Sequence, residues 1–363
     1  MQERNNRNYG IDIYKILCMF LVIAFHFSDH GTTPLLAGNP LTFNWILLAS
    51  SRIWGGVCNC CFMLVSGYFL SSKTGFTWRN VFKLYGQVWF YSIVSFVAAV
   101  ALGTIPFGKL ALVKALLPLT FNRYWYFSTY IVVYLFHPFF NRLIDALTQT
   151  QHQGICILTI SLFSLYYTLS HAEWIIGTNR LLIFITLYFV GAYIRKYEIR
   201  IEKRKTVLIG ALMLVLSIVS LVCMRFVGAV LHMDNVITYF VWGTEKILPV
   251  VTSVFLFLAF ERVDVSNILV KRCVSFIAPA VFGVYLFHIG DLQTWLFREV
   301  FNNEITYTKG LMFLGQMLLA MISTFVVGIA IDKMRIWLLE RPFMKYMEKI
   351  IFKLDKKSKD YIG

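Results

Sequence analysis

Composition sets the broad class of this protein. The chain has 363 residues, of which 58% are apolar and 15% charged, and its mean hydropathy is +0.67. Soluble domains hold about 45–50% apolar and about 25% charged residues, and one globular core cannot bury such an excess. These values exclude a soluble enzyme, a secreted disulfide scaffold and a disordered regulator. Because the apolar segments do not alternate with period two, we expect an all-α polytopic membrane protein rather than an outer-membrane barrel.

Apolar segments long enough to cross a membrane recur along the chain. A spanning helix needs about 20 mostly apolar residues. The first segment lacks a small-residue cleavage site after it, so we expect a retained signal-anchor rather than a cleaved signal peptide. We predict ten spanning helices, at residues 11–28, 54–71, 80–102, 125–141, 154–171, 180–195, 206–226, 236–260, 273–296 and 310–332.

The net charge of +15 is also consistent with a membrane protein, because its basic residues are unevenly distributed between the predicted loops. With the N-terminus inside, the predicted inner segments hold 24 Lys and Arg residues and the outer segments hold 8. Cytoplasmic loops of membrane proteins carry such an excess, so the charge indicates orientation and not a nucleic-acid partner. An even number of spans then places both termini in the cytoplasm.

The first predicted helix carries ionisable residues on one face. Lys15 and His26 are 11 residues apart, which is about 20° past three full turns and about 16 Å along the axis. Asp12 precedes Lys15 by three residues and can pair with it. A charge inside a span costs at least about 2.5–3.5 kcal/mol and usually marks a functional site. We therefore predict a functional polar stripe from the cytoplasmic rim to the outer half of this helix.

The second to fourth predicted helices offer weaker signals. The cluster Cys58-Asn59-Cys60-Cys61 lacks a second ligand pair at zinc-site spacing, so we expect small packing residues and no metal. His137 precedes Pro138 near the inner end of its helix, and we interpret it as structural.

Ionisable residues return in the eighth and ninth predicted helices. Counting at 1.5 Å per residue places His288 about 24 Å above the inner border, at the same depth as His26. Glu245 lies nearer the midplane of its predicted helix. Its carboxylate could orient an imidazole, or it could form a structural ion pair with the adjacent Lys246.

The C-terminal segment has a different pattern. After a single transmembrane domain at 1–340, residues 341–363 are predicted to form a cytoplasmic, basic, amphipathic helix. Such a helix lies on the inner leaflet with its lysines near anionic headgroups, although a partner-binding helix is the alternative. The predicted apolar face comprises Phe343, Tyr346, Met347, Ile350, Ile351 and Leu354.

Six stretches together resemble the membrane acyltransferase type 3 family. IDIYKILCMFLVIAFH at 11–26 is similar to the family's opening, in which an acidic residue, an Arg, ten residues and a His follow in order; here Asp12, Lys15 and His26 match, with Lys in place of the usual Arg. A basic pair four residues apart is matched by Arg79 and Lys83, again with Lys in the second place. The other matching stretches are CFMLVSGYFL at 61–70, YWYFSTYIVVYLFHPFFN at 124–141, YFVGAYIRKYE at 188–198 and VFGVYLFH at 281–288.

The resemblance implies an enzyme that moves an acyl group, usually acetyl, from cytoplasmic acyl-CoA to hydroxyls of cell-surface carbohydrate. It implies His26 as general base or as the site of a covalent acyl-imidazole, with His288 and Tyr285 at the acceptor end. Arg79 and Lys83 would bind the phosphates of coenzyme A, or they are ordinary positive-inside residues. Lys15 would hold the donor near its thioester, or only neutralise Asp12.

The expected partners follow from this resemblance. They are acetyl-CoA or another acyl-CoA as donor, a surface polysaccharide or lipid-linked glycan as acceptor, and the lipids of a bacterial plasma membrane, without a metal cofactor. A transporter or flippase for a lipid-linked saccharide would also use buried charges at mid-depth. A membrane sensor or scaffold without chemistry is a third hypothesis.

Overall fold

The computed structural model describes residues 7–30, 33–36, 41–170, 180–233 and 236–362. Over these ranges the chain forms helices and no β-strand, as the composition predicts. The first half contains α1 (Tyr9–Asp29), α2 (Phe43–Ser51), α3 (Ile53–Leu70), α4 (Trp78–Ala101), α5 (Lys109–Leu116), α6 (Trp125–Ala146), α7 (Gln149–Ile160) and α8 (Tyr167–Ser170). The second half contains α10 (Arg180–Lys196), α11 (Lys203–Leu231), α12 (Ile247–Glu261), α13 (Ile268–Ile277), α14 (Val281–His288), α15 (Asn303–Tyr307), α16 (Leu311–Arg335), α17 (Arg341–Tyr346) and α18 (Glu348–Ile362).

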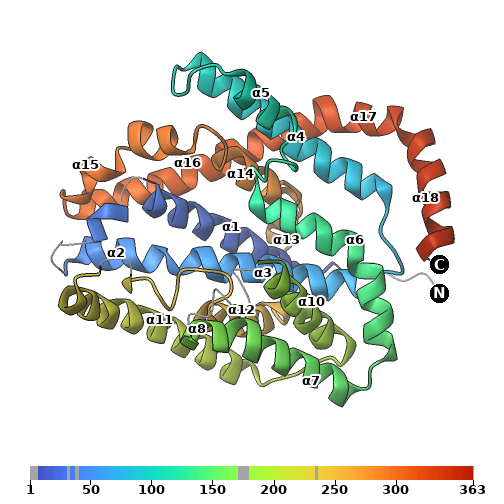
Figure 1. Ribbon diagram of the computed structural model, residues 1–363, viewed down its shortest axis with the longest axis horizontal. Coiled ribbons are helices and arrows are strands. Elements are labelled where there is room, and N and C mark those ends of the chain that lie inside the picture. The colour runs from blue at the N-terminus through green and yellow to red at the C-terminus, as the bar shows by residue number, and fades with distance from the viewer. Residues whose placement is uncertain (1–6, 31–32, 37–40, 171–179, 234–235, 363) are drawn as a thin grey trace.

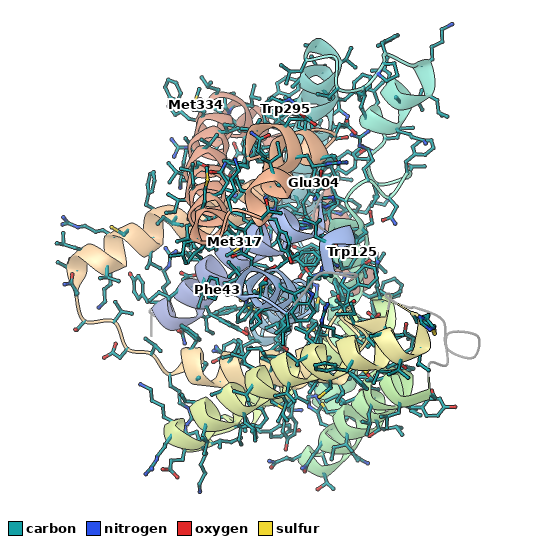
Figure 2. All side chains as sticks on the ribbon, turned by 90° about the vertical axis from the view of Figure 1, so that its left-hand side faces the viewer. Phe43, Trp125, Trp295, Glu304, Met317 and Met334 are labelled. Atoms are coloured by element: carbon teal, nitrogen blue, oxygen red, sulfur yellow. The ribbon has the colours of Figure 1, made fainter. Side chains whose placement is uncertain are left out.

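Helices α1 and α3 form the centre of the molecule. Both views show α16 on one side of this pair and α11 with α7 on the other (Figures 1 and 2). Helix α1 contacts α3, α12, α14 and α16, and α3 contacts α10 and α12. The polar stripe predicted on the first helix therefore lies inside the bundle and not on its lipid-facing surface.

The start of α1 is fixed by one asparagine. The Asn8 side-chain oxygen accepts a hydrogen bond from the Ile11 N–H at 3.0 Å, which caps the helix. The same side chain donates to the Glu261 carbonyl at 2.8 Å, at the end of α12. The N-terminal end of α1 is thus attached to the end of α12. This contact fixes the position of α1, and of the residues along it, relative to α12.

Two glycines allow α3 and α10 to pack closely. A Cβ on Gly67 would lie 2.4 Å from the Tyr188 carbonyl oxygen, and a Cβ on Gly191 would lie 2.4 Å from the Leu64 carbonyl oxygen. Small residues let helix backbones approach each other within a membrane, where packing replaces the hydrophobic driving force.

The described helices include seven that are long and apolar enough to cross a membrane. Helix α11 is the most apolar, and only 17% of its span is buried; exposed residues such as Leu208 (66%) and Val230 (78%) suit contact with lipid. The chain is a multi-pass membrane protein. Each of the ten predicted segments contains a helix, but the count of ten spans and the positions of both termini remain predictions. The seven are Tyr9–Asp29, Phe43–Leu70, Trp78–Ala101, Gln149–Ser170, Lys203–Leu231, Ile268–His288 and Leu311–Tyr346.

The predicted helix at 236–260 is wrong in its first part. Helix α12 begins only at Ile247, and a turn precedes it. Gly243 has φ +132°, a conformation that L side chains rarely adopt, and the Glu245 carboxylate lies where a Gly243 Cβ would stand. Glu245 and Lys246 therefore lie in this turn and not within a span. Lys246 is buried, with its ammonium 4.2 Å from the centroid of the Tyr239 ring.

The C-terminal segment is helical, as predicted. In α18 the Asp355 carboxylate accepts a hydrogen bond from the Trp78 N–H at 2.7 Å, which attaches this helix to the start of α4. On the predicted apolar face Ile351 is buried, whereas Ile350 and Tyr346 are 47% and 82% exposed. Binding of this segment to the inner leaflet stays a prediction.

Candidate functional site

The N-terminal end of α1 carries the ion pair that the sequence predicts. Lys15 Nζ lies 2.6 Å from Asp12 Oδ1, and Arg7 Nε lies 2.5 Å from Asp12 Oδ2. The Asp12 side chain is 10% exposed and that of Lys15 25%. One carboxylate thus neutralises one of two cations, and this end of the helix keeps an excess positive charge that could attract an anionic substrate.

Further along α1, His26 meets His288 from the end of α14. The two ring centroids are 5.3 Å apart, in agreement with the equal depths predicted from the sequence. His30 approaches from the other side, with its ring centroid 5.5 Å from that of His26. Three imidazoles from two helices therefore form one group, the histidine cluster (His26, His30 and His288).

The hydrogen bonds of His288 define its tautomer. Its Nδ1 lies 2.6 Å from the Val284 carbonyl oxygen, and because a carbonyl can only accept, Nδ1 carries the proton. Nε2 is then an unprotonated acceptor; it is buried and has no hydrogen-bond partner in the described part of the chain. Buried polar atoms normally have a partner, so this nitrogen suits a substrate hydroxyl.

His26 has a partner that the sequence did not indicate. The Gln293 side-chain amide lies 3.1 Å from His26 Nδ1; Gln293 is in the helical residues that lead into the segment Trp295–Val300. An amide can donate through nitrogen or accept through oxygen, so it can stabilise either imidazole tautomer. A search for ionisable residues in spans could not find Gln293, because the side chain is neutral.

We expect Gln293→Leu to lower turnover about 10- to 100-fold, by analogy with the loss found when the hydrogen-bond partner of a metal-ligating histidine is removed. Leucine fills similar volume but cannot orient the imidazole. Gln293→Glu retains an acceptor for Nδ1–H, so Nε2 stays free as a base and turnover should exceed that of the leucine variant. Steady-state kinetics of the two purified variants compares them, and equal rates in both would contradict the orienting role.

Two ion pairs involve residues that neighbour the histidine cluster in the sequence. Arg52 pairs with Asp29 at 3.1 Å, and Arg123 pairs with Asp291. Burial lowers the pKa of His30. The Asp29 carboxylate raises this pKa, and the Arg52 guanidinium lowers it.

One group in this region has the geometry of a metal site. The ligand atoms of His26, Asp29 and His30 lie within 4.8 Å of one another. Asp29 is paired with the Arg52 guanidinium, and a fixed positive charge beside the carboxylate opposes the binding of a cation. The cysteines of the second predicted span pack in the core instead, where Cys60 Sγ lies 3.2 Å from the Thr244 carbonyl oxygen.

Two of the residues predicted to bind the acyl donor, Arg79 and Lys83, lie on α4. Arg79 is exposed, and Lys83 Nζ lies 3.1 Å from Glu340 Oε1. Glu340 also pairs with Arg335 at 2.8 Å. The fully buried Asp332 accepts several hydrogen bonds through Oδ1. This network was not predicted from the sequence because Asp332 and Arg335 lie where the last predicted span ends. The donors to Asp332 are Gln87 at 2.9 Å, Tyr91 at 3.3 Å and Arg335 at 2.8 Å.

The remaining residues singled out in the sequence are Glu245 and His137. The turn that holds Glu245 packs on α3, where the Cys60 thiol reaches the carbonyl of Thr244, so the catalytic role of Glu245 stays a prediction. His137 Nδ1 lies 2.5 Å from the Tyr134 carbonyl within α6. Its Nε2, like that of His288, has no hydrogen-bond partner among the described residues, so the structural interpretation of His137 stays a prediction.

Comparison with known proteins is consistent with this geometry. Residues 8–333 match a family model described as an acyltransferase domain. The match begins just before α1 and ends within α16, so it covers the ion pair of α1, the histidine cluster and Asp332. No curated protein and no solved structure matches the chain.

Proposed function

This chain belongs to the membrane acyltransferase type 3 family, and on that premise we propose that it transfers an acyl group, in the simplest case acetyl, from cytoplasmic acyl-CoA to a carbohydrate hydroxyl. The acceptor is a cell-surface polysaccharide or a lipid-linked glycan, and the location is the plasma membrane. The observation that carries this proposal is the contact of His26 with His288, whose unprotonated Nε2 has no partner among the described residues.

The chemistry needs a base between two substrates. The acceptor hydroxyl attacks the thioester carbonyl, forming a C–O bond, while His26 takes the hydroxyl proton as general base. His288, in contact with His26, accepts through Nε2 from a neighbouring hydroxyl of the acceptor sugar and so orients the acceptor. The tetrahedral intermediate then expels the coenzyme A thiolate, which takes the proton from the imidazolium. Proton and electrons balance without a metal or a redox partner.

The donor enters from the inner face in this proposal. Coenzyme A is a polyanion, and Arg79, Lys83 and Lys15 supply cations at that end of the bundle. Phosphate groups prefer such charge-assisted hydrogen bonds. The positive-inside distribution supports this sidedness, and the histidines then receive the acceptor from the outer face.

A test of sidedness addresses the whole proposal. The purified protein is sealed in lipid vesicles of known orientation, with radiolabelled acetyl-CoA on the cytoplasmic side and the host's surface glycan on the other. Labelled glycan is the expected result. If glycan crosses the membrane without label, the chain is a transporter; if label appears only when both substrates share the cytoplasmic side, the crossing step is wrong.

We expect Lys15→Met to raise the KM for acyl-CoA about tenfold or more, while Lys15→Arg retains activity, because a charge-assisted contact contributes about 1.5–3 kcal/mol. Asp12 keeps its pair with Arg7 in both variants, so the fold should persist. Equal KM values for Lys15→Met and wild type would reduce Lys15 to a neutralising partner.

The double variant Arg79→Ala/Lys83→Ala should also bind acyl-CoA more weakly. Glu340 retains Arg335 as a partner, so the loss of Lys83 leaves no unpaired carboxylate. Attraction by exposed charges is screened within about 10 Å at 0.1 M salt, so the difference from wild type should shrink as salt increases. Donor titrations at low and high salt measure this, and a difference independent of salt would contradict electrostatic binding.

A further inference from the structure

Next to the histidine cluster lie two buried tyrosines whose hydroxyls have no partner. Tyr126 is 8% exposed and Tyr285 is 6% exposed. Neither hydroxyl has a hydrogen-bond partner in the described part of the protein. A buried hydroxyl without a partner loses its bonds to water and gains none in exchange. The two tyrosine rings are in contact, with centroids 6.0 Å apart. Their pair of unpartnered hydroxyls therefore indicates a place where another polar atom binds.

The two rings connect directly to the proposed reaction centre. Tyr285 lies one helical turn before His288 on α14, and their ring centroids are 6.4 Å apart. His288 in turn contacts His26. The rings that carry the unpartnered hydroxyls therefore adjoin the histidine cluster through Tyr285, beside the place where the acyl carbonyl must lie during attack.

The start of α6 adds a positive field at the same point. Tyr126 is the second residue of α6, and Tyr124, the N-cap residue, makes no capping hydrogen bond with its side chain. The Tyr285 ring contacts the Tyr126 ring at this helix start. The first N–H groups of a helix carry a partial positive charge. On the outer side of this helix start, the Arg180 guanidinium stacks on Trp125 at 4.1 Å, and Figure 2 labels Trp125 at the edge of the central helices.

We propose that the hydroxyls of Tyr285 and Tyr126, together with the N-terminal end of α6, form an oxyanion hole for the acyl group. When the acceptor hydroxyl attacks, the C=O π electrons move onto the carbonyl oxygen, which these donors bind. As the intermediate collapses, that electron pair returns to carbon, the C–S bond breaks and the coenzyme A thiolate leaves. This inference rests on the proposed acyl-transfer function and assigns residues to its transition state.

Preorganised donors act on charge that develops in the transition state, and removal of one such donor lowers kcat about 100- to 1,000-fold in other enzymes. Tyr285→Phe and Tyr126→Phe remove one oxygen each without changing ring packing. We expect kcat to fall by that order in each variant, while the KM for acyl-CoA changes little. Thermal stability should stay equal or rise, because no hydrogen bond of the protein is lost.

Tyr197→Phe is the matched control. Its hydroxyl also lacks a partner among the described residues, but the ring lies beside His152 at the end of α10, with centroids 5.8 Å apart. Its kcat and stability should equal those of wild type. A retained kcat, within about threefold, in both Tyr285→Phe and Tyr126→Phe would overturn the inference while transfer by the wild type upholds the function. A comparable loss in Tyr197→Phe would also overturn it, and absence of transfer by the wild type would instead refute the function.

Discussion

Replacing His26 with asparagine should abolish acyl transfer while the protein remains folded. General-base catalysis contributes about 100- to 10,000-fold to rate, and asparagine keeps a polar group near Gln293 but cannot take a proton at neutral pH. His26 contacts two other imidazoles, His30 and His288, neither of which occupies the family's histidine position on α1. The rate of label transfer from acetyl-CoA by the purified variant, at saturating donor, measures the effect.

The control for this variant is another buried histidine. His152 is fully buried and its Nε2 hydrogen-bonds to the Phe189 carbonyl at 3.0 Å, away from the histidine cluster. His152→Asn should lower thermal stability rather than catalysis at a temperature where it is folded. A His26 variant that kept most of the wild-type rate would show that the proton goes elsewhere, with His288 the first alternative.

Replacing Asp332 with alanine should have the largest effect on stability. Its side chain is fully buried and lies 2.8 Å from the Arg335 guanidinium, and it also accepts from Gln87 and Tyr91. Removing one partner of a buried pair costs about 3–5 kcal/mol where the other charge is left uncompensated; Arg335 keeps Glu340 as a second partner, so we expect a loss at the lower end of this range. We expect a large drop in the midpoint of thermal unfolding in detergent.

Two comparisons separate this effect from a general loss of charge. Glu202 pairs with Lys205 on the surface, where both side chains are more than half exposed, and Glu202→Ala should cost about 0–1 kcal/mol. The double variant Asp332→Leu/Arg335→Met removes both charges and should be more stable than Asp332→Ala. A single variant as stable as wild type would mean that the network contributes little.

Much of this protein could be predicted from the sequence because a helix has a constant period. The spacing of Asp12, Lys15 and His26 places them on one face of α1 wherever that helix lies, and the structure confirms the pairing of Asp12 with Lys15. The helical class follows from composition alone. Depth counting also placed His26 and His288 at one level, where they are in contact.

Other predictions failed or were incomplete because they depended on local backbone geometry. The apolar run at 236–260 resembles one span, but Gly243 adopts a conformation that ends the helical pattern. Glu245 therefore lies in a turn rather than inside a helix. Hydropathy averages over about 20 residues and cannot resolve one glycine with a positive φ.

What the sequence determined by itself is the helical class, the family and the polar stripe of α1, since each depends on order and spacing within short segments. Only the tertiary structure decided which side chains from distant segments meet. The Gln293 amide hydrogen-bonds to His26, and the Tyr126 ring contacts the Tyr285 ring. Asp332 accepts a hydrogen bond from Gln87. The apolar faces of membrane helices look alike in sequence, so which faces adjoin is set by the packing of small residues such as Gly67 and Gly191 and by buried polar bonds that no periodicity reveals.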